Sequence, residues 1–171
     1  MEITAQLIGF AGIIVNALIY QQSDRASILK IKLTSDVLWA AHFSMLGAYS
    51  AAVVACIGIL REFVFMKRKK LSSLIFFLIL SFVSAALTWK GPASILPSAA
   101  SAASVISFYI GNSLLTRLLS FPISACMGTY SAMNGSIAGI VNELLTVASS
   151  AAALFIYRKQ RKKLAEITLQ K

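Results

Sequence analysis

The chain has few charged residues, and few of those are acidic. Of its 171 residues, 13% are charged and 58% are apolar, and only 6 are Asp or Glu. A soluble domain carries about 25% charged residues and about 45–50% apolar ones. The surplus of apolar residues needs lipid as a second solvent, which predicts an integral membrane protein.

Histidine, cysteine and proline are also scarce. One histidine, two cysteines and three prolines exclude a disulfide scaffold and offer no cluster at metal-ligand spacing. A Gly-rich phosphate loop and a nucleophile elbow are missing from the sequence as well. We therefore predict a protein that is not an enzyme, with no catalytic residues, metal or cofactor, in which Cys56 and Cys126 are packing groups within apolar segments.

Basic residues outnumber acidic ones, and the formal net charge is +10. They gather in blocks at 67–70 and 158–163, with a looser group at Arg25, Lys30 and Lys32, and each block borders an apolar run. Lys and Arg in short loops are retained on the cytoplasmic side of a membrane. The pattern predicts oriented helices in a lipid bilayer and no binding to nucleic acid.

Apolar runs and the breaks between them predict seven spans. We place them near 3–20, twice within 33–66 with a turn near 47–50, and then at 71–89, 92–111, 114–133 and 136–157. Each is long enough to cross about 30 Å of hydrocarbon at about 1.5 Å per residue. The first run lacks the basic region of a secretory signal, so we expect a retained span.

The basic residues also predict the orientation. Blocks on the same side must be separated by an even number of crossings, and seven spans satisfy this with the N-terminus outside and the C-terminus in the cytoplasm. Lys90 is then the basic residue that lies clearly outside.

A weak internal repeat divides the chain into two triplets. Sliding the sequence by 88 positions puts Trp39 on Met127, His42 on Tyr130 and residues 47–50 on 135–138. We predict an all-α membrane protein in a 3-1-3 arrangement of two parallel triple-helix bundles. The predicted units are a first bundle at 1–66, a linker helix at 71–89, a second bundle at 93–157 and a basic cytoplasmic tail at 158–171. Parallel repeats place a solute path at their interface near mid-bilayer.

Particular residues carry a family resemblance over nearly the whole chain. They are Tyr20-Gln21-Gln22, Asp24-Arg25, the stretches 38–43 and 46–48, Arg61, Leu96-Pro97, Arg117 and Asn142-Glu143. With them the chain resembles the bacterial YgjV-type inner membrane proteins, and the resemblance implies a location in the bacterial inner membrane. That family is similar in turn to the PQ-loop and SWEET (MtN3-like) group, whose members carry small solutes such as sugars by alternating access between two parallel triplets.

The second resemblance implies a path lined from both halves. Gln21-Gln22 stands where the PQ-loop group has its Pro-Gln pair. The resemblance implies a path-lining Asn on the third helix of each bundle. Asn142 matches one of them, while the first half has Val54-Ala55 at the other.

Polar side chains inside spans are costly and mark candidate sites. The predicted solute-binding residues are Trp39, His42, Tyr130, Asn142, Glu143 and Asn16. Glu143 could bind a proton or a solute hydroxyl, or fix helix packing as a hydrogen-bonded carboxyl. His42 shares a helix face with Trp39 and could face a cavity or be a satisfied interhelix histidine. If His42 and Glu143 meet, they form a proton-sensitive pair.

Other charges are predicted to be structural. Asp36 has the spacing to pair with Lys32 on one helix face. Arg61 and Glu62 fall near the inner end of their helix, where a solvated end, with Lys30 as the cation for Glu62, competes with a gating role.

Two classes of function remain open. One is a carrier of a small polar solute, sugar-like or another metabolite, working by alternating access. The other is a non-transporting inner membrane protein that binds a partner or assembles, with a homo-oligomer as one form. A carrier needs a polar cavity that is reachable from one face, whereas an assembly module can be dry and sealed.

Overall fold

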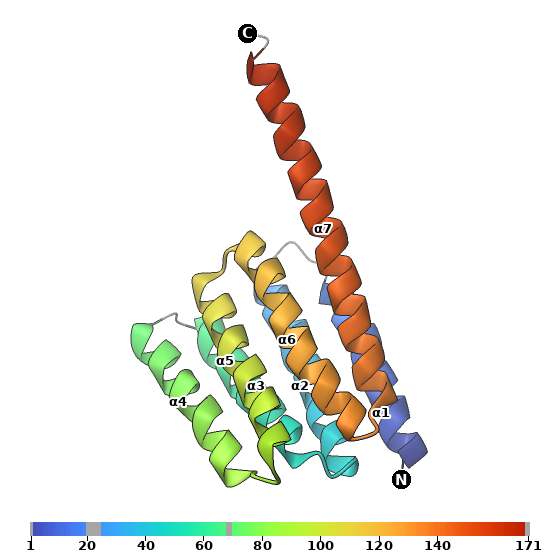
Figure 1. The fold of residues 1–171 in the computed structure, drawn as a ribbon. Coiled ribbons are helices and arrows are strands. Elements are labelled where there is room, and N and C mark those ends of the chain that lie inside the picture. Colours follow the sequence, from blue (N-terminus) through green and yellow to red (C-terminus); the bar gives the residue numbers. More distant parts are fainter. Residues whose placement is uncertain (1, 20–24, 68–69, 170–171) are drawn as a thin grey trace.

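The structure, a computed structural model, describes residues 2–19, 25–67 and 70–169, and for residues 25, 26, 29 and 160–169 it describes the backbone alone. Within these ranges the chain forms seven α-helices and one short 3-10 turn (Figure 1). They are α1 (Glu2–Ile19), α2 (Arg25–Met45), α3 (Tyr49–Lys67), α4 (Leu71–Leu87), η1 (Pro92–Ser94), α5 (Ile95–Ile110), α6 (Ser113–Met133) and α7 (Ile137–Leu169).

The predicted turns and helices match this order. The helix predicted to begin before Lys32 begins at Arg25. The last helix differs, because α7 does not stop near Tyr157 but continues to Leu169, so the predicted tail is largely a helical extension beyond the other helices (Figure 1). No Gly or Pro follows Gly139 in the chain, so nothing in the sequence breaks the helix there. Tyr20-Gln21-Gln22 and Asp24 lie outside the described residues.

Four of the described helices are long and apolar enough to cross a membrane by themselves. These are α1, α3, α5 together with η1, and α7 up to Lys159; α4 is apolar but shorter. The helices α2 and α6 are long but less apolar. Several of their polar residues, such as Asp36, His42 and Ser124, are buried, so a hydropathy average understates how apolar their outer faces are.

Six of the helices close into a ring, with α4 outside it. Neighbours in sequence pack together from α1 to α3 and from α5 to α7. Contacts of α3 with α5 and of α1 with α7 complete the ring, and α4 packs on α3 and α5. Serines fasten α4 to α5, since Ser81 and Ser101 Oγ are 2.8 Å apart and Ser84 and Ser98 Oγ are 3.2 Å apart.

The 88-residue repeat is visible in the backbone. Helices α2 and α6 both have 21 residues and both begin and end 88 positions apart. The turns that follow them contain Gly47 and Gly135, whose φ angles are 70° and 66°, in the left-handed region that glycine adopts without a Cβ clash. Four backbone hydrogen bonds recur with the same shift, for example from Ala48 N to Phe43 O and from Ser136 N to Ser131 O, both at 2.9 Å.

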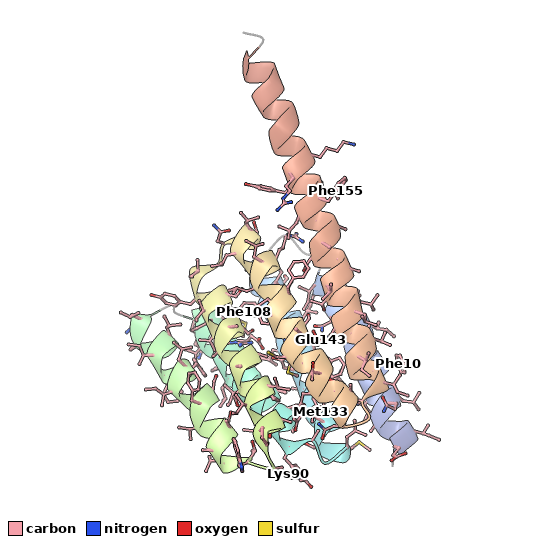
Figure 2. The ribbon with its side chains drawn as sticks, viewed as in Figure 1. Phe10, Lys90, Phe108, Met133, Glu143 and Phe155 are labelled. Carbon is pink, nitrogen blue, oxygen red and sulfur yellow. The ribbon has the colours of Figure 1, made fainter. Side chains whose placement is uncertain are left out.

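We name the two ends of the ring after glycines. The Gly47 end holds the turns at Gly47, Gly91 and Gly135 together with the start of α1; the Gly111 end holds the turn at Gly111 and the start of α2 (Figure 1). The extension of α7, which carries Phe155, projects from the Gly111 end (Figure 2). Cys56 and Cys126 are free thiols, and Cys56 is exposed on α3, so the prediction that it is a packing group was wrong.

Candidate functional site

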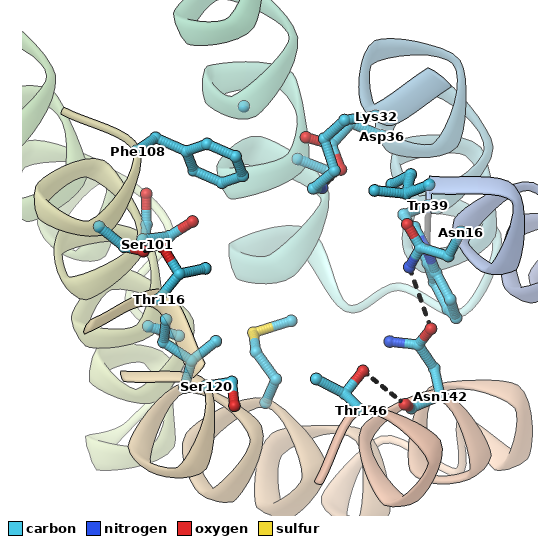
Figure 3. A pocket seen from close by; sticks show the side chains of 18 of the residues that line it. Asn16, Lys32, Asp36, Trp39, Ser101, Phe108, Thr116, Ser120, Asn142 and Thr146 are labelled. Atoms are coloured by element: carbon cyan, nitrogen blue, oxygen red, sulfur yellow. Dashed lines mark hydrogen bonds and ion pairs between the residues drawn. The ribbon is translucent and has the colours of Figure 1, made fainter. Parts of the chain in front are cut away.

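A cavity of about 720 Å³ lies inside the ring and is lined from all six of its helices. Figure 3 shows the open space with Lys32 and Asp36 on one side and Asn142 and Thr146 on the other. The polar and charged lining residues are Asn16, Lys32, Asp36, Arg61, Ser101, Ser104, Ser107, Ser113, Thr116, Arg117, Ser120, Asn142, Glu143, Thr146 and Ser150. The cavity can therefore offer several hydrogen bonds and charges to one small molecule.

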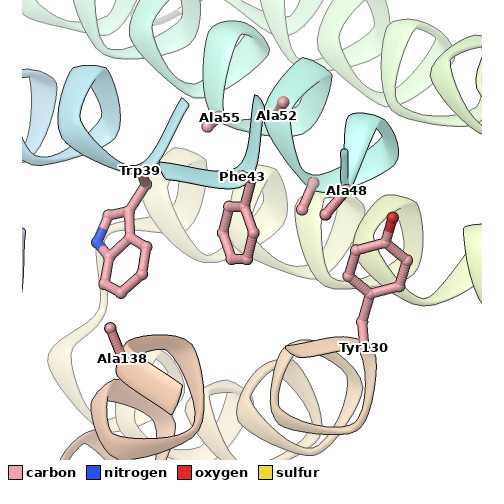
Figure 4. Packing of buried hydrophobic residues seen from close by; sticks show 8 residues of the cluster. Trp39, Phe43, Ala48, Ala52, Ala55, Tyr130 and Ala138 are labelled. Atoms are coloured by element: carbon pink, nitrogen blue, oxygen red, sulfur yellow. The ribbon is translucent and has the colours of Figure 1, made fainter. Parts of the chain in front are cut away.

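The cavity reaches one end of the ring and is sealed at the other. At the Gly111 end its lining includes Gly111 and Ser113, both of which are exposed. Toward the Gly47 end it stops at a packed layer of buried side chains (Figure 4). That layer consists of Trp39, Phe43, Ala48, Ala51, Ala52, Ala55, Tyr130 and Ala138.

His42 packs against this layer and connects α1 to the turn before α7 through hydrogen bonds. Its Nδ1 lies 2.6 Å from the Ala5 carbonyl oxygen, and its Nε2 lies 2.6 Å from Ser136 Oγ. The ring is fully buried and makes an edge contact with Trp39 at 5.3 Å between centroids. A Cβ at Gly9 would lie 2.8 Å from His42 Nδ1, so only glycine leaves room for the imidazole.

Gln6 makes a second connection between the same segments. Its Nε2 donates to the Gly135 carbonyl at 2.9 Å, and its Oε1 accepts from Ala138 N at 3.1 Å. The start of α1 is thus held to the turn between α6 and α7 at the sealed end.

A chain of amide hydrogen bonds crosses the cavity wall. Ser35 Oγ donates to Asn16 Oδ1 at 2.9 Å, and Asn16 Nδ2 donates to Asn142 Oδ1 at 3.1 Å. Asn142 Nδ2 in turn donates to Glu143 Oε1 at 3.0 Å. A Cβ at Gly128 would stand 3.6 Å from Glu143 Cβ, which shows how closely α6 passes this residue. Elements from both ends of the sequence therefore hold the Glu143 carboxyl in place.

The wall formed by α2 and α3 carries two ion pairs. Lys32 pairs with Asp36 one turn further along α2, as predicted. Arg61 Nη2 pairs with Glu62 Oε1 at 2.8 Å, and Arg61 Nη1 donates to Ser104 Oγ at 3.1 Å. The prediction of a solvated end with Lys30 as partner was wrong, because Arg61 is 3% and Glu62 is 0% exposed and they pair with each other.

The wall formed by α6 and α7, with the end of α5, carries hydroxyl groups. Ser107 Oγ donates to Thr116 Oγ1 at 2.9 Å, and Ser120 Oγ donates to Ser150 Oγ at 2.8 Å. Thr146 Oγ1 bonds to the Asn142 carbonyl at 2.9 Å (Figure 3). This wall offers neutral groups to a solute, together with the charged side chains of Glu143 and Arg117.

Many lining residues are related by the 88-residue shift. Residues at equivalent positions of the two halves face the same cavity, as expected if the repeat places them around a common axis. The pairs in the lining are Asn16 and Ser104, Ile19 and Ser107, Ile28 and Thr116, Lys32 and Ser120, Trp39 and Met127, Ala51 and Gly139, Val54 and Asn142, Ala55 and Glu143, and Gly58 and Thr146.

The structure brings together four of the six predicted site residues. Trp39, Asn16, Asn142 and Glu143 line the cavity. His42 and Tyr130 do not belong to the lining. Tyr130 is part of the sealed layer, and His42 packs against that layer and bonds to Ala5 and Ser136 instead of meeting Glu143. Sequence reasoning treated Arg61 as a helix-end residue and passed over the serines. Their helical spacing at 101, 104 and 107 is a signal for one shared face.

A sequence model of a protein family matches residues 3–163, nearly the whole chain, and its description is bacterial inner membrane protein. This chain belongs to the Imp-YgjV family of bacterial inner membrane proteins. The family assignment, together with the apolar helices, supports a location in the bacterial inner membrane. No curated protein and no solved structure matches the chain.

Proposed function

We propose that this Imp-YgjV member is a seven-span carrier that moves a small polar solute across the inner membrane by alternating access. The observation that carries the proposal is the cavity of about 720 Å³, which has a polar lining, reaches the Gly111 end and is sealed at the Gly47 end. Charged and hydroxyl groups inside a bilayer are costly unless water or a ligand occupies their site. An assembly module would not need such a space.

The repeat supports the proposed mechanism. Two parallel triplets, α1–α3 and α5–α7, would rock against each other around the cavity while α4 links them outside the ring. The 88-residue pairs in the lining come from both triplets, as a path between them requires. Breaking the contacts of His42 and Gln6 would open the sealed end, and closing the Gly111 end would complete the exchange.

The proposal keeps the predicted orientation, with the Gly47 end outside and the Gly111 end in the cytoplasm. The basic residues Lys67 and Lys70 lie at the Gly111 end, as expected for cytoplasmic loops. The cavity therefore faces the cytoplasm in this conformation.

Orientation is tested by single cysteines in a background of Cys56→Ser and Cys126→Ser. Tyr49→Cys, Lys90→Cys and Met133→Cys place exposed thiols at the Gly47 end, and Lys70→Cys places one at the Gly111 end. An impermeant maleimide should label the first three in intact cells and the fourth only after permeabilisation. Labelling of Lys70→Cys in intact cells would contradict the orientation.

Transport is tested by proteoliposomes that contain the full-length protein and are offered labelled mixtures of sugars, amino acids and organic acids. Uptake of at least one mixture above that of empty liposomes is expected. A change of Asn142 to Leu should reduce it, because this residue lines the cavity. No uptake of any mixture by stably folded protein would favour the assembly alternative.

A further inference from the structure

Lys32 and Glu143 lie on opposite walls of the cavity. Lys32 stands on the α2 wall and Glu143 on α7, and Figure 3 shows Lys32 on the side of the opening opposite Asn142, the neighbour of Glu143. Among the described residues Glu143 makes no ion pair, and its side-chain partners are the neutral Ser124 hydroxyl and Asn142 amide. Lys32 interacts with it electrostatically without pairing to it.

Two cations of the lining are only partly buried: Arg117, about one turn nearer the Gly111 end, and Lys32. The Lys32 side chain is 23% exposed, whereas the side chains of Arg61 and Glu62 are 4% and 1% exposed and are held by each other. An ammonium has three N–H donors, and the bond to Asp36 uses one of them. The remaining donors are free to bind an anionic group.

The charged residues of the cavity are not repeated between the two halves of the chain. The four charged positions Lys32, Asp36, Arg61 and Glu62 correspond, 88 residues later, to Ser120, Ser124, Ser149 and Ser150. In the other direction, Asn142 and Glu143 correspond to the apolar Val54 and Ala55. At these positions the first half thus holds the cation Lys32, and the second half holds a carboxyl that makes no ion pair among the described residues. Binding of a neutral, symmetric solute would not require a cation in one half and a carboxyl in the other.

We propose that the solute is a small zwitterion of the amino acid type, which binds with its carboxylate at Lys32 and its ammonium group at Glu143. This inference rests on the proposed function and names its substrate class. A zwitterion brings no net charge into the membrane, and each of its charges meets an opposite one at low local dielectric, where such pairing is strong. The hydroxyl groups of Thr116, Ser120 and Thr146 would bind the rest of the molecule.

The experiment uses full-length protein in proteoliposomes and three separate labelled mixtures: L-amino acids, hydroxy acids without an amino group, and neutral sugars. Uptake of the amino acid mixture alone is expected. Unlabelled hydroxy acids and the corresponding amines, which each lack one charge, should compete at least about tenfold more weakly than amino acids.

Variants test the two contacts. Glu143→Gln and Lys32→Met should each lower amino acid uptake about thirtyfold, because each leaves one charge of the solute unpaired. In Glu143→Gln the preference for amino acids over hydroxy acids as competitors should also disappear, a change that a merely unstable variant would not produce. Glu2→Gln and Lys70→Met remove the same charges at exposed positions outside the cavity and should leave uptake unchanged.

The outcomes distinguish the two proposals. Uptake of sugars or hydroxy acids in place of amino acids would overturn the substrate class and leave the carrier function standing. Amino acid uptake with an unchanged competitor preference in Glu143→Gln would overturn the assigned contact. Absence of uptake for all three mixtures would overturn the carrier function itself.

Discussion

The side chains of Asn16 and Asn142 are joined by a hydrogen bond of 3.1 Å, from Nδ2 to Oδ1. The bond connects α1 to α7 and so closes the ring between residues 126 positions apart in sequence. Both side chains also line the cavity, so the contact that closes the ring is part of the candidate site. Stability and the proposed solute binding would therefore be coupled at this point.

We expect the Asn16–Asn142 bond to contribute about 1 kcal/mol to the free energy of unfolding, as interhelix hydrogen bonds in membranes do. A double-mutant cycle of Asn16→Leu and Asn142→Leu, with unfolding followed in mixed micelles, measures this coupling. Thr34→Val, at an exposed position of α2, serves as the control and should show no coupling to Asn142→Leu. Strictly additive effects of the two leucines would show that the bond contributes nothing.

The buried pair of Arg61 and Glu62 gives a second prediction. Arg61→Leu alone leaves a fully buried carboxylate without its cation and should cost about 3–5 kcal/mol of unfolding free energy. The double variant Arg61→Leu and Glu62→Leu should recover most of that loss, since it leaves neither charge unpaired. Thermal unfolding in detergent measures both. Equal losses for the single and the double variant would contradict the pairing.

Gly9 should not tolerate even one methyl group. A Cβ there would stand 2.5 Å from Ala138 Cβ and 2.8 Å from His42 Nδ1, so Gly9→Ala must push α1 away from α7. We expect a loss of about 1–3 kcal/mol, the usual cost of overpacking. Ala11→Leu, on an exposed face of the same helix, is the matched control and should be nearly neutral. Denaturant titration in detergent compares the two.

Gly47 and Gly135 should respond alike to substitution. Each has a positive φ, and a Cβ added to either glycine would have no atom within 4 Å. An alanine at either position would therefore strain the backbone but would not clash with a neighbour. Gly47→Ala and Gly135→Ala should therefore each cost about 1–2 kcal/mol, and the two costs should agree. Melting temperatures of the purified variants give the comparison. Unequal losses would show that the two turns are not equivalent.

Ser136 should control access to the cavity from the Gly47 end. Ser136→Ala removes its hydrogen bonds to His42 Nε2 and to Gly139 N, which weakens the sealed layer. With Met127→Cys as a reporter in a background free of other cysteines, labelling from that end should become about tenfold faster. Ser44→Ala, at an exposed position, should leave the rate unchanged. An unchanged rate in Ser136→Ala would show that this bond does not limit opening.

Much of the local structure follows from the sequence. Gly47, Gly91, Gly111 and Gly135 mark turns because the chain there takes a positive φ, and the apolar runs between them are helices. The shift of 88 residues was detectable in the sequence around His42 and Tyr130, and the turns that follow contain equivalent backbone hydrogen bonds. The pairing of Lys32 with Asp36 also followed, because residues four apart meet on one helix face.

The sequence did not predict which residues line the cavity and which lie at its sealed end. Trp39 and His42 share a helix face, yet only Trp39 lines the cavity. His42 lies nearer the Gly47 end, where it bonds to Ala5 and Ser136. Arg61 reads as a helix-end arginine, but the packing of α5 against α3 buries it against Ser104 and Phe108. Helical periodicity gives the face of a residue and says nothing of which distant helix covers that face.

The sequence by itself determined a membrane protein, its helices and its repeat, because composition, turn glycines and periodicity act over short stretches of chain. Only the tertiary structure decided that α1 meets α7 through Gly9 and Asn16, and that one end of the ring is sealed while the other is open. These contacts join residues more than a hundred positions apart, and they depend on the fit of one helix surface to another, which no local pattern encodes.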